Sequence, residues 1–239
     1  MLSPMTLQVT NTRCLIEASK RLGLTTVAYD PNDNFICIKA GGKNLFFANY
    51  STPFNTNSFS KISRDKELTY LLLKDMIRMP KTFGVFDPNY SEDGEIKNNK
   101  EQFSENLRKI LNQINFPLVV KPNSLSRGTN FSLCKREEEV LSALEKIFNR
   151  NSRHYDFVAL LQEYVEVAEE YRVIVYKNEI ILIYNLYKEI KTEIMKAEIE
   201  TFTKPIFGVI DIGFAGLDII VGKDGQMYLL EINAEPGFA

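Results

Sequence analysis

Two acidic residues and an asparagine near the end of the sequence, Asp218, Glu231 and Asn233, are spaced so that they could bind a divalent cation together. They lie on two strand-like runs, residues 216–222 and 226–233, separated by an Asp-Gly pair that is a strong signal for a two-residue hairpin turn. Side chains alternate between the two faces of a strand, so a two-residue turn places all three residues on one face. The hairpin is therefore a candidate metal site.

The predicted register of this hairpin places Asp218 directly opposite Glu231 and Ile220 opposite Leu229. Two opposed carboxylates repel each other unless a cation lies between them. Ligands made only of carboxylate and amide oxygens suit Mg²⁺, which keeps several waters and also binds phosphate oxygens. A half-buried hairpin with a solvated polar face is the alternative, and a loop one residue longer would break this register. The opposite face is wholly apolar and consists of Leu217, Ile219, Val221, Tyr228, Leu230 and Ile232.

A second group of residues could bind phosphate. Lys121 ends a short apolar strand and is followed by a loop of small polar residues that includes Ser126, Arg127 and Gly128. Small residues let backbone N–H groups approach phosphate oxygens, and the two basic side chains supply positive charge. The spacing is not that of a P-loop, and a plain strand–loop–strand connection is the alternative.

Lys66 lies near the start of a helix predicted over residues 62–79. A cation in this position opposes the helix dipole, which suggests an anion nearby; a solvated surface lysine is the alternative. We expect the apolar stripe of this helix to face the core, and it consists of Leu68, Leu71, Leu72 and Met76.

Two further strands bring polar residues to their ends. The strand predicted over residues 157–165 is apolar until it ends in Gln-Glu-Tyr-Val. On the strand predicted over residues 170–176, Glu170 and Arg172 share one face and apolar residues occupy the other. An alternating strand with a surface ion pair is the alternative interpretation, and such pairs contribute little to stability.

The composition is that of a soluble globular protein, with 239 residues, 44% apolar and 25% charged. The net charge of −2 gives no overall basic field for nucleic acid or anionic membrane. Three scattered cysteines and the lack of a signal-like N-terminus predict a reducing, cytoplasmic location. The single histidine, His154, lies in a polar run, which argues against a Ser-His-Asp mechanism.

Predicted helices and strands intermix along the chain, with several antiparallel hairpins, so we expect an α+β protein built in layers. The first 60 residues predict a small α/β domain, a βαβ-type start with mixed strands. No glycine-rich phosphate fingerprint follows its first strand, which excludes a dinucleotide site there.

The motifs in their order along the chain resemble the ATP-grasp superfamily over roughly residues 60–238. They are Asp-Lys-Glu at 65–67, Phe-Pro-Leu-Val-Val-Lys-Pro at 116–122, Leu-Gln-Glu-Tyr-Val at 161–165, Glu-Tyr-Arg-Val at 170–173, Gly-Leu-Asp at 216–218 and Leu-Glu-Ile-Asn at 230–233. The N-terminal part, with Ile-Cys-Ile-Lys-Ala-Gly-Gly-Lys at 36–43, looks most like the branch of cyanophycin synthetase and the bifunctional glutathione synthetases. D-Alanine–D-alanine ligase is a more distant likeness.

The resemblance implies an ATP-grasp fold, in which two antiparallel-sheet subdomains clasp ATP behind a small N-terminal α/β domain. The implied divisions are residues 1–60 for the N-terminal domain, 61–165 for the first, phosphate-loop subdomain and 166–239 for the second, metal-binding subdomain, which looks short at its C-terminus.

The same resemblance implies a role for each candidate site residue. Lys66 and Lys121 hold the α- and β-phosphates. Phosphates are covered by a loop containing Ser126, Arg127 and Gly128, adenine is bound by Glu163, Tyr164, Val165 and Glu166, ribose by Glu170, and two Mg²⁺ ions by Asp218, Glu231 and Asn233. Arg172 steadies an acyl phosphate or a substrate carboxylate, and it is catalytic with Lys121.

The implied reaction is that of a carboxylate–amine ligase. A substrate carboxylate attacks the γ-phosphate of ATP to give an acyl phosphate, and an amine then displaces phosphate to form an amide bond. The expected partners are a small amino acid or peptide substrate, with no nucleic acid and no membrane; a homodimer is left open. A non-catalytic or regulatory ATP-binding module is the alternative, and ligases with other acceptors or with protein substrates also share such a nucleotide site.

Three features depart from the family pattern. D-Alanine–D-alanine ligases have an arginine two positions before the first metal aspartate, where this chain has Gly216, which makes that dipeptide chemistry less favoured. The stretch between residues 187 and 208 is short for a loop that closes over substrates. Family members usually continue beyond the point that corresponds to Ala239. A minimal ligase, a truncated chain and a degenerate relative are the alternatives.

Overall fold

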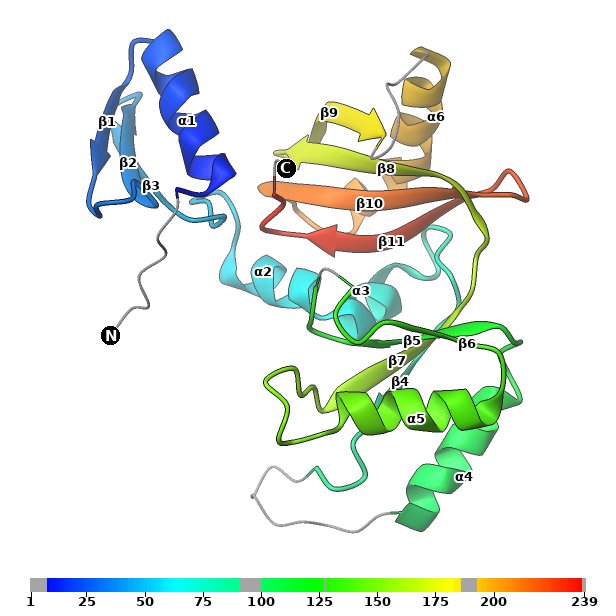
Figure 1. The fold of residues 1–239 in the computed structure, drawn as a ribbon. Helices are drawn as coiled ribbons and strands as arrows, with labels where there is room; N and C mark the ends of the chain where they lie inside the picture. The colour runs from blue at the N-terminus through cyan, green and yellow to red at the C-terminus, as the bar shows by residue number, and fades with distance from the viewer. Residues whose placement is uncertain (1–7, 91–99, 127, 186–192, 238–239) are drawn as a thin grey trace.

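The computed structural model describes residues 8–90, 100–126, 128–185 and 193–237, and it contains three antiparallel sheets (Figure 1). The first sheet has the order β1-β2-β3 (Thr25–Ala28, Phe35–Ala40, Lys43–Ala48), and α1 (Thr10–Arg21) lies against it. Every strand pair in it is antiparallel, so the prediction of a βαβ-type start with mixed strands is wrong. No described helix is both long and apolar enough to cross a membrane.

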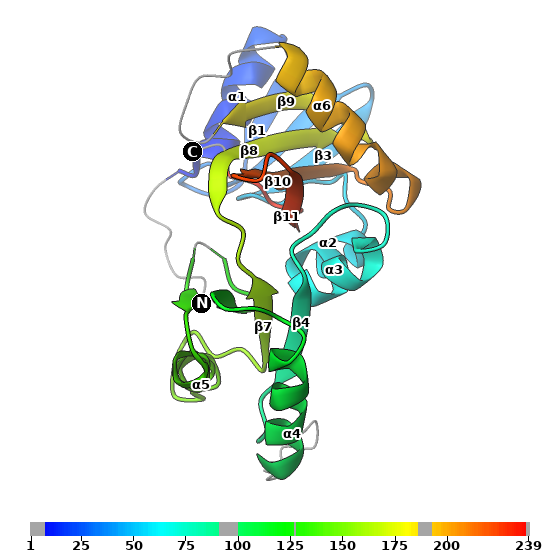
Figure 2. The ribbon, with the colours of Figure 1, turned by 90° about the vertical axis from the view of Figure 1, so that its right-hand side faces the viewer.

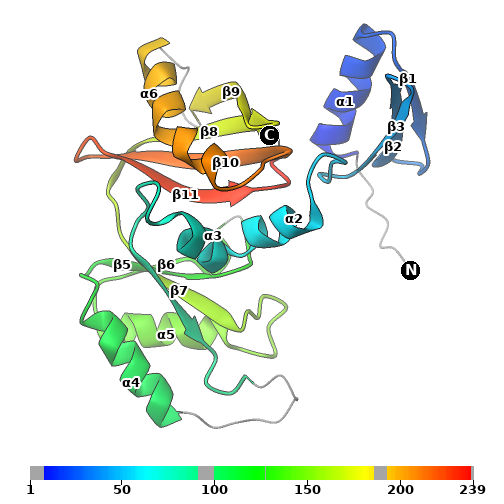
Figure 3. The ribbon, with the colours of Figure 1, turned by 180° about the vertical axis from the view of Figure 1, so that it is seen from behind.

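The helix predicted over residues 62–79 is instead two short helices, α2 (Asn57–Arg64) and α3 (Lys66–Leu73). Asp65 breaks the helix because it has an extended backbone, φ −97° and ψ 103°, and its side chain caps α3 by accepting from the N–H of Leu68 at 2.9 Å. Lys66 is thus the first residue of α3. Both helices lie between the other two sheets, as Figures 1 and 3 show.

The predicted apolar stripe of this segment does not face the core. The side chains of Leu68, Leu71, Leu72 and Met76 are all exposed, by 38–54% of their surface. The buried residues are Thr69 and Leu73 on α3 and Ile77 after it. The break at Asp65 shortens the helix to two turns, and a periodicity read over eighteen residues no longer defines its inner face.

The second sheet has the order β4-β7-β5-β6 (Thr82–Phe86, Val158–Glu163, Leu118–Pro122, Ser132–Cys134). The helices α4 (Lys100–Leu111) and α5 (Glu137–Ile147) cover one face, and their apolar side chains share one buried cluster with those of the strands. The other face is directed toward the third sheet (Figure 2).

The third sheet has the order β11-β10-β8-β9 (Met227–Asn233, Phe214–Gly222, Val167–Tyr176, Glu179–Asn185). Its buried face packs against α6 (Glu193–Thr203) and the 3₁₀ turn Lys204–Gly208, with Ile199 and Ile206 in the same cluster as Val173 and Leu217. The residues between β7 and β8 run from the second sheet to the third (Figure 2). This segment thus connects the second sheet to the third.

The hairpin of β10 and β11 differs from the prediction in two places, and their effects on the strand register cancel at Asp218. The N–H of Gly222 donates to the carbonyl of Gln226 at 2.9 Å, so the loop has three residues, and Gly225 adopts φ +75°. A bulge at residue 230 then moves the register back by one residue. Asp218 faces Glu231 as predicted, whereas Ile220 pairs with Tyr228, not Leu229.

The changed register corrects the predicted apolar face of the hairpin. Leu229 packs into the core, with Met227 against it, in place of Tyr228 and Leu230. Leu230 lines the cavity described below, and Tyr228 lies opposite Ile220, which lines it too.

The left-handed backbone at Gly225 is testable. We expect Gly225→Ala to lower the free energy of unfolding by about 1–2 kcal/mol, because a Cβ is disfavoured at positive φ. The control is Gly208→Ala, where no positive φ is required and no heavy atom lies within 4 Å of the added Cβ. Urea denaturation of both variants measures the difference. Equal stabilities would contradict the left-handed backbone at Gly225.

Candidate active site

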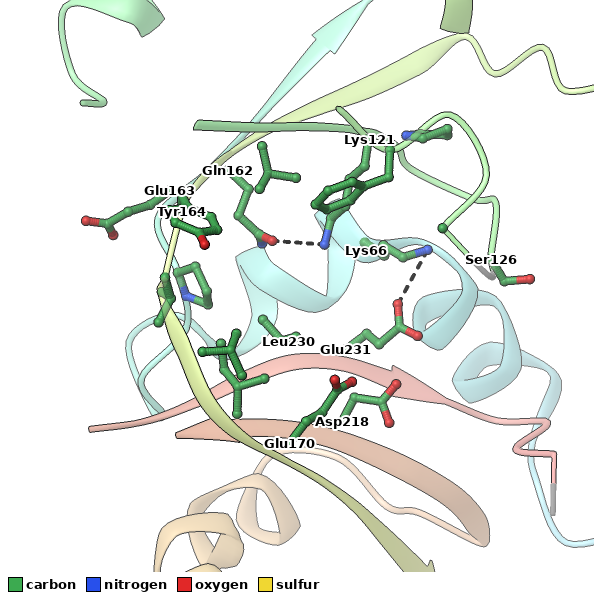
Figure 4. A pocket seen from close by; sticks show the side chains of 18 of the residues that line it. Lys66, Lys121, Ser126, Gln162, Glu163, Tyr164, Glu170, Asp218, Leu230 and Glu231 are labelled. Carbon is green, nitrogen blue, oxygen red and sulfur yellow. Dashed lines mark hydrogen bonds and ion pairs between the residues drawn. The ribbon is translucent and has the colours of Figure 1, made fainter. Parts of the chain in front are cut away.

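A cavity of about 330 Å³ lies between the second and third sheets (Figure 4). This volume is within the range of small-molecule sites, which begins at roughly 300 Å³. The structure brings most of the predicted site residues to its lining: Lys66, Lys121, Ser126, Gly128, Glu163, Tyr164, Val165, Glu170, Asp218 and Glu231.

Three described residues of the predicted site, Arg172, Asn233 and Glu166, are not in this lining. Arg127 is outside the described residues. Arg172 lies next to the cavity and contacts it through Asp218. Asn233 lies on the same strand as Glu231 but beyond the cavity wall, and its Oδ1 accepts from the N–H of Glu235 at 2.9 Å.

Glu166 fastens the hairpin tip rather than lining the cavity. Its carboxylate accepts from Lys223 Nζ at 2.5 Å, and its carbonyl accepts from the N–H of Lys223 at 2.8 Å. This double contact ties the segment that crosses between the sheets to the β10–β11 turn. Glu166 therefore positions Tyr164 and Val165, which do line the cavity.

Lys66 connects three parts of the site. Its ammonium donates to the carbonyl oxygens of Asn123 and Leu125 at 3.2 and 2.7 Å, and it lies 3.7 Å from the carboxylate of Glu231. Its position as the first residue of α3 places the side chain between the loop after β5 and the edge of β11. With 12% of its side chain exposed, this charge is close to the carboxylates it must balance.

Lys121 lies at the centre of a short hydrogen-bond relay. Its Nζ donates to Gln162 Oε1 at 2.9 Å, and the amide nitrogen of Gln162 donates to Thr82 Oγ1 at 2.8 Å. Burial lowers the pKa of Lys121 to about 8; Glu231 opposes this shift and the neighbouring Lys66 adds to it. The relay holds the ammonium toward the cavity (Figure 4).

Asp218, one of the two opposed carboxylates of the hairpin, has a perturbed pKa. The pKa of Asp218 is raised to about 7: burial is the main cause, Arg172 opposes it and Glu231 adds to it. Arg172 makes a two-pronged contact with Asp218, from Nε to Oδ1 and from Nη2 to Oδ2 at 3.0 Å. The guanidinium of Arg172 is thus one cation that offsets the repulsion between the two carboxylates.

A glycine makes that contact with Asp218 sterically feasible. A Cβ at Gly216 would lie 3.0 Å from Cδ of Arg172 and 2.9 Å from Cβ of Pro236. Arg172 reaches Asp218 from the neighbouring strand because the space over Gly216 is free of a side chain. The same crowding excludes a larger residue at this position.

Among the described residues, no group of three His, Cys, Asp or Glu side chains could enclose a metal ion. The donors at the candidate metal position are the two carboxylates of Asp218 and Glu231, with the amide of Asn233 two residues along β11. This oxygen-only set fits Mg²⁺, which keeps most of its waters and is held by one or two carboxylates together with substrate phosphates.

Sequence reasoning assigned no role in the site to ten of the lining residues, among them Gln162, Ile220 and Leu230. Gln162 carried a signal, because it is the one polar residue in the buried run Val158–Gln162. A buried amide must find hydrogen-bond partners, and these turned out to be Lys121 and Thr82.

Comparisons with known proteins show which family and fold the chain is similar to. A family model described as the RimK-like ATP-grasp domain matches residues 64–239. The D-alanine–D-alanine ligase of Staphylococcus carnosus (strain TM300) is 24% identical over 167 residues, which cover 60% of this chain and 46% of the ligase.

Two solved structures of D-alanine–D-alanine ligases have a similar fold. The enzyme from Coxiella burnetii gives a TM-score of 0.56 at 20% identity, covering 74% of this chain and 49% of the enzyme. The enzyme from Bacillus anthracis, solved as a complex with ATP, gives 0.53 at 22% identity, covering 74% and 55%. The chain spans about half the length of these relatives.

The lowered pKa of Lys121 predicts a pH dependence for anion binding. Only the ammonium form attracts phosphate, so the Kd for ADP should rise as the pH increases through about 8. An arginine stays charged across this range, so Lys121→Arg should bind ADP with a Kd that is flat from pH 7.5 to 9.5, whatever its absolute value. Calorimetric titrations of both proteins test this. The same pH profile in both would show that Lys121 is not responsible.

Proposed function

The chain belongs to the RimK-like ATP-grasp family, and on this premise we propose that it is an ATP- and Mg²⁺-dependent carboxylate–amine ligase. Its substrates are an amino acid or small peptide and an amine, and its product is an amide. One observation supports the proposal most directly. Two lysines, Lys66 and Lys121, face two opposed carboxylates, Asp218 and Glu231, across one cavity (Figure 4).

The side of the cavity that carries Lys66 and Lys121, the lysine wall, binds the phosphates of ATP. Lys121 already points its ammonium into the cavity, and Lys66 lies beside it. Ser126 and Gly128 bring the loop after β5 to the same space, and Gly128 has φ +66°, a conformation that exposes backbone N–H groups in tight turns. Charge and backbone donors together match a polyphosphate.

The segment that crosses between the sheets binds the nucleoside. Glu163, Tyr164 and Val165 line the closed side of the cavity, where backbone groups can meet the edge of adenine. Glu170 follows on β8 and lies within reach of the ribose hydroxyls. Glu166 fixes this segment to the hairpin turn, as described above.

The opposite side of the cavity, which carries Asp218 and Glu231 and is called the carboxylate wall, holds the metal. Asp218 and Glu231 supply the oxygens, and Asn233 completes the set through its second lone pair or after release of the Glu235 N–H. Bound Mg²⁺ would supply charge neutralisation on the transferring phosphoryl group. Glu170 and Glu163 add further negative charge to the lining, so a nucleotide without a divalent cation would bind weakly.

In the first step, a carboxylate oxygen of the substrate bonds to the γ-phosphorus of ATP while the bond from that phosphorus to the β,γ-bridging oxygen breaks. Lys121 and Lys66 stabilise the charge that accumulates on the departing ADP. In the second step, the amine nitrogen bonds to the acyl carbon, inorganic phosphate leaves and the nitrogen loses a proton. Arg172 holds the acyl phosphate through Nη1, which makes none of the described hydrogen bonds of this side chain.

The pairing of Arg172 with Gly216 supports this role for the arginine. D-Alanine–D-alanine ligases place an arginine where this chain has Gly216, and here Arg172 fills that space from the neighbouring strand. An arginine from another strand would thus serve the same part of the site.

Three further statements remain predictions: the three-part division at residues 60/61 and 165/166, the cytoplasmic location and the oligomeric state.

Removing the charge of Glu231 tests the proposal. Glu231→Gln should keep the fold, because one oxygen becomes an NH₂ group on a partly exposed side chain. It should abolish Mg²⁺-dependent release of ADP in an assay with pooled amino acids and dipeptides. The control is Glu179→Gln, an exposed change at the far edge of the same sheet. Retained ADP release in Glu231→Gln would remove the metal assignment, and nucleotide binding by the parent without any release would favour a non-catalytic module.

A further inference from the structure

The segment Asn123–Leu125 joins β5 to the part of the chain that lines the cavity, and it is held from two sides. Asn123 is 4% exposed, its N–H donates to the carbonyl of Val158 at 3.1 Å, and its Oδ1 accepts from the N–H of Glu67 at 2.9 Å. Leu125, the last residue of the segment, lines the cavity, and so do Ser126 and Gly128, which follow the segment. We call residues 123–125 the loop shoulder.

On the inner side of the loop shoulder lies Asp156, a buried carboxylate that the site described above does not use. It is 4% exposed, and both hydrogens that Ser124 can donate go to its Oδ2: the N–H at 2.7 Å and the hydroxyl at 2.8 Å. Its Oδ1 accepts from the N–H of Val158 at 3.1 Å, at the start of β7. One charged group thus ties the loop shoulder to the centre of the second sheet.

On the side of α3, the loop shoulder is held by Lys66, whose ammonium contacts the carbonyls of Asn123 and Leu125, and by the N–H of Glu67, which donates to Asn123 Oδ1. Two of the three ammonium hydrogens of Lys66 go to these carbonyls, and Glu231 lies 3.7 Å from the same nitrogen. A phosphate that takes more than one of these hydrogens therefore competes with the loop shoulder, and a phosphate is the stronger acceptor. The contacts between Lys66 and the loop shoulder therefore weaken when the site is filled, whereas those of Asp156 are out of reach of the ligand.

We propose that Asp156 is a positioning residue for nucleotide binding: it holds the loop shoulder in place when Lys66 turns from the loop to the phosphates. The proposal rests on the nucleotide-binding function proposed above. Asp156 does not touch the nucleotide and acts through Ser124, which sets where Ser126 and Gly128 meet the phosphates.

The structure offers a matched control, Asp87. It is 3% exposed, and its carboxylate also accepts three hydrogen bonds, from the N–H of Asn89 at 2.9 Å, the hydroxyl of Tyr155 at 3.0 Å and Nε of Arg150 at 3.4 Å. It lies after β4, and none of its described contacts is with the loop shoulder or the lining of the cavity. A purely structural effect of losing a buried carboxylate in this subdomain should appear in both variants.

The experiment compares Asp156→Asn, Asp87→Asn and the parent by thermal unfolding, hydrogen exchange and calorimetric titration with ADP and Mg²⁺. Both variants should lose stability. Only Asp156→Asn should speed amide exchange at residues 124–126 and 128–131, and only it should raise the Kd for ADP, by about tenfold for the loss of one charge-assisted hydrogen bond. Ser124→Ala, which keeps the backbone donor, should give a smaller rise.

Each outcome decides a separate point. An unchanged Kd in Asp156→Asn, or an equal rise in Asp87→Asn, would overturn the positioning role. If the parent itself does not bind ADP, the nucleotide function fails, and exchange at the loop shoulder still shows whether Asp156 anchors it. Unchanged exchange there would overturn the anchor itself.

Discussion

The repulsion between Asp218 and Glu231 is the constraint on which the rest of the site depends. The two carboxylates face each other on paired strands, and burial together with Glu231 outweighs Arg172 and raises the pKa of Asp218 to about 7. The fold opposes this cost with Arg172 from one side and Lys66 from the other. Lys121, buried on the opposite sheet, completes a cavity whose two walls have opposite charge. This arrangement supports the proposal that the cavity takes a cation and an anion together.

The hairpin shows how a correct prediction can rest on two errors. The Asp-Gly pair predicted a two-residue turn, and the structure has a three-residue loop followed by a bulge at residue 230. Each shifts the register by one residue, in opposite directions, so the acids meet as predicted while Tyr228 and Leu230 change face. Local turn chemistry does not encode a bulge, because the bulge depends on how β11 packs against the rest of the molecule.

Other residues were predictable only where a local signal existed. The order of motifs indicated the ATP-grasp fold, and Lys66 and Lys121 were found from their positions at the ends of elements. The inner face of α3 was not predicted correctly. The helix breaks at Asp65 because the side chain of Asp65 caps α3, and this cap competes with continuation of the helix. The roles of Glu166 and Gln162 are set by contacts with residues 57 and 80 positions away, Lys223 and Thr82, and no periodicity reports such contacts.

The central claim is that one cavity binds Mg²⁺ and ATP together, and thermal unfolding tests it most directly. A non-hydrolysable ATP analogue at about a hundred times its Kd should add roughly 2.7 kcal/mol to the free energy of unfolding, but only when Mg²⁺ is present. For a chain of this size that corresponds to a rise in Tm of about 5–10 °C. An unchanged Tm with the analogue and Mg²⁺, or an equal rise without the metal, would contradict the account.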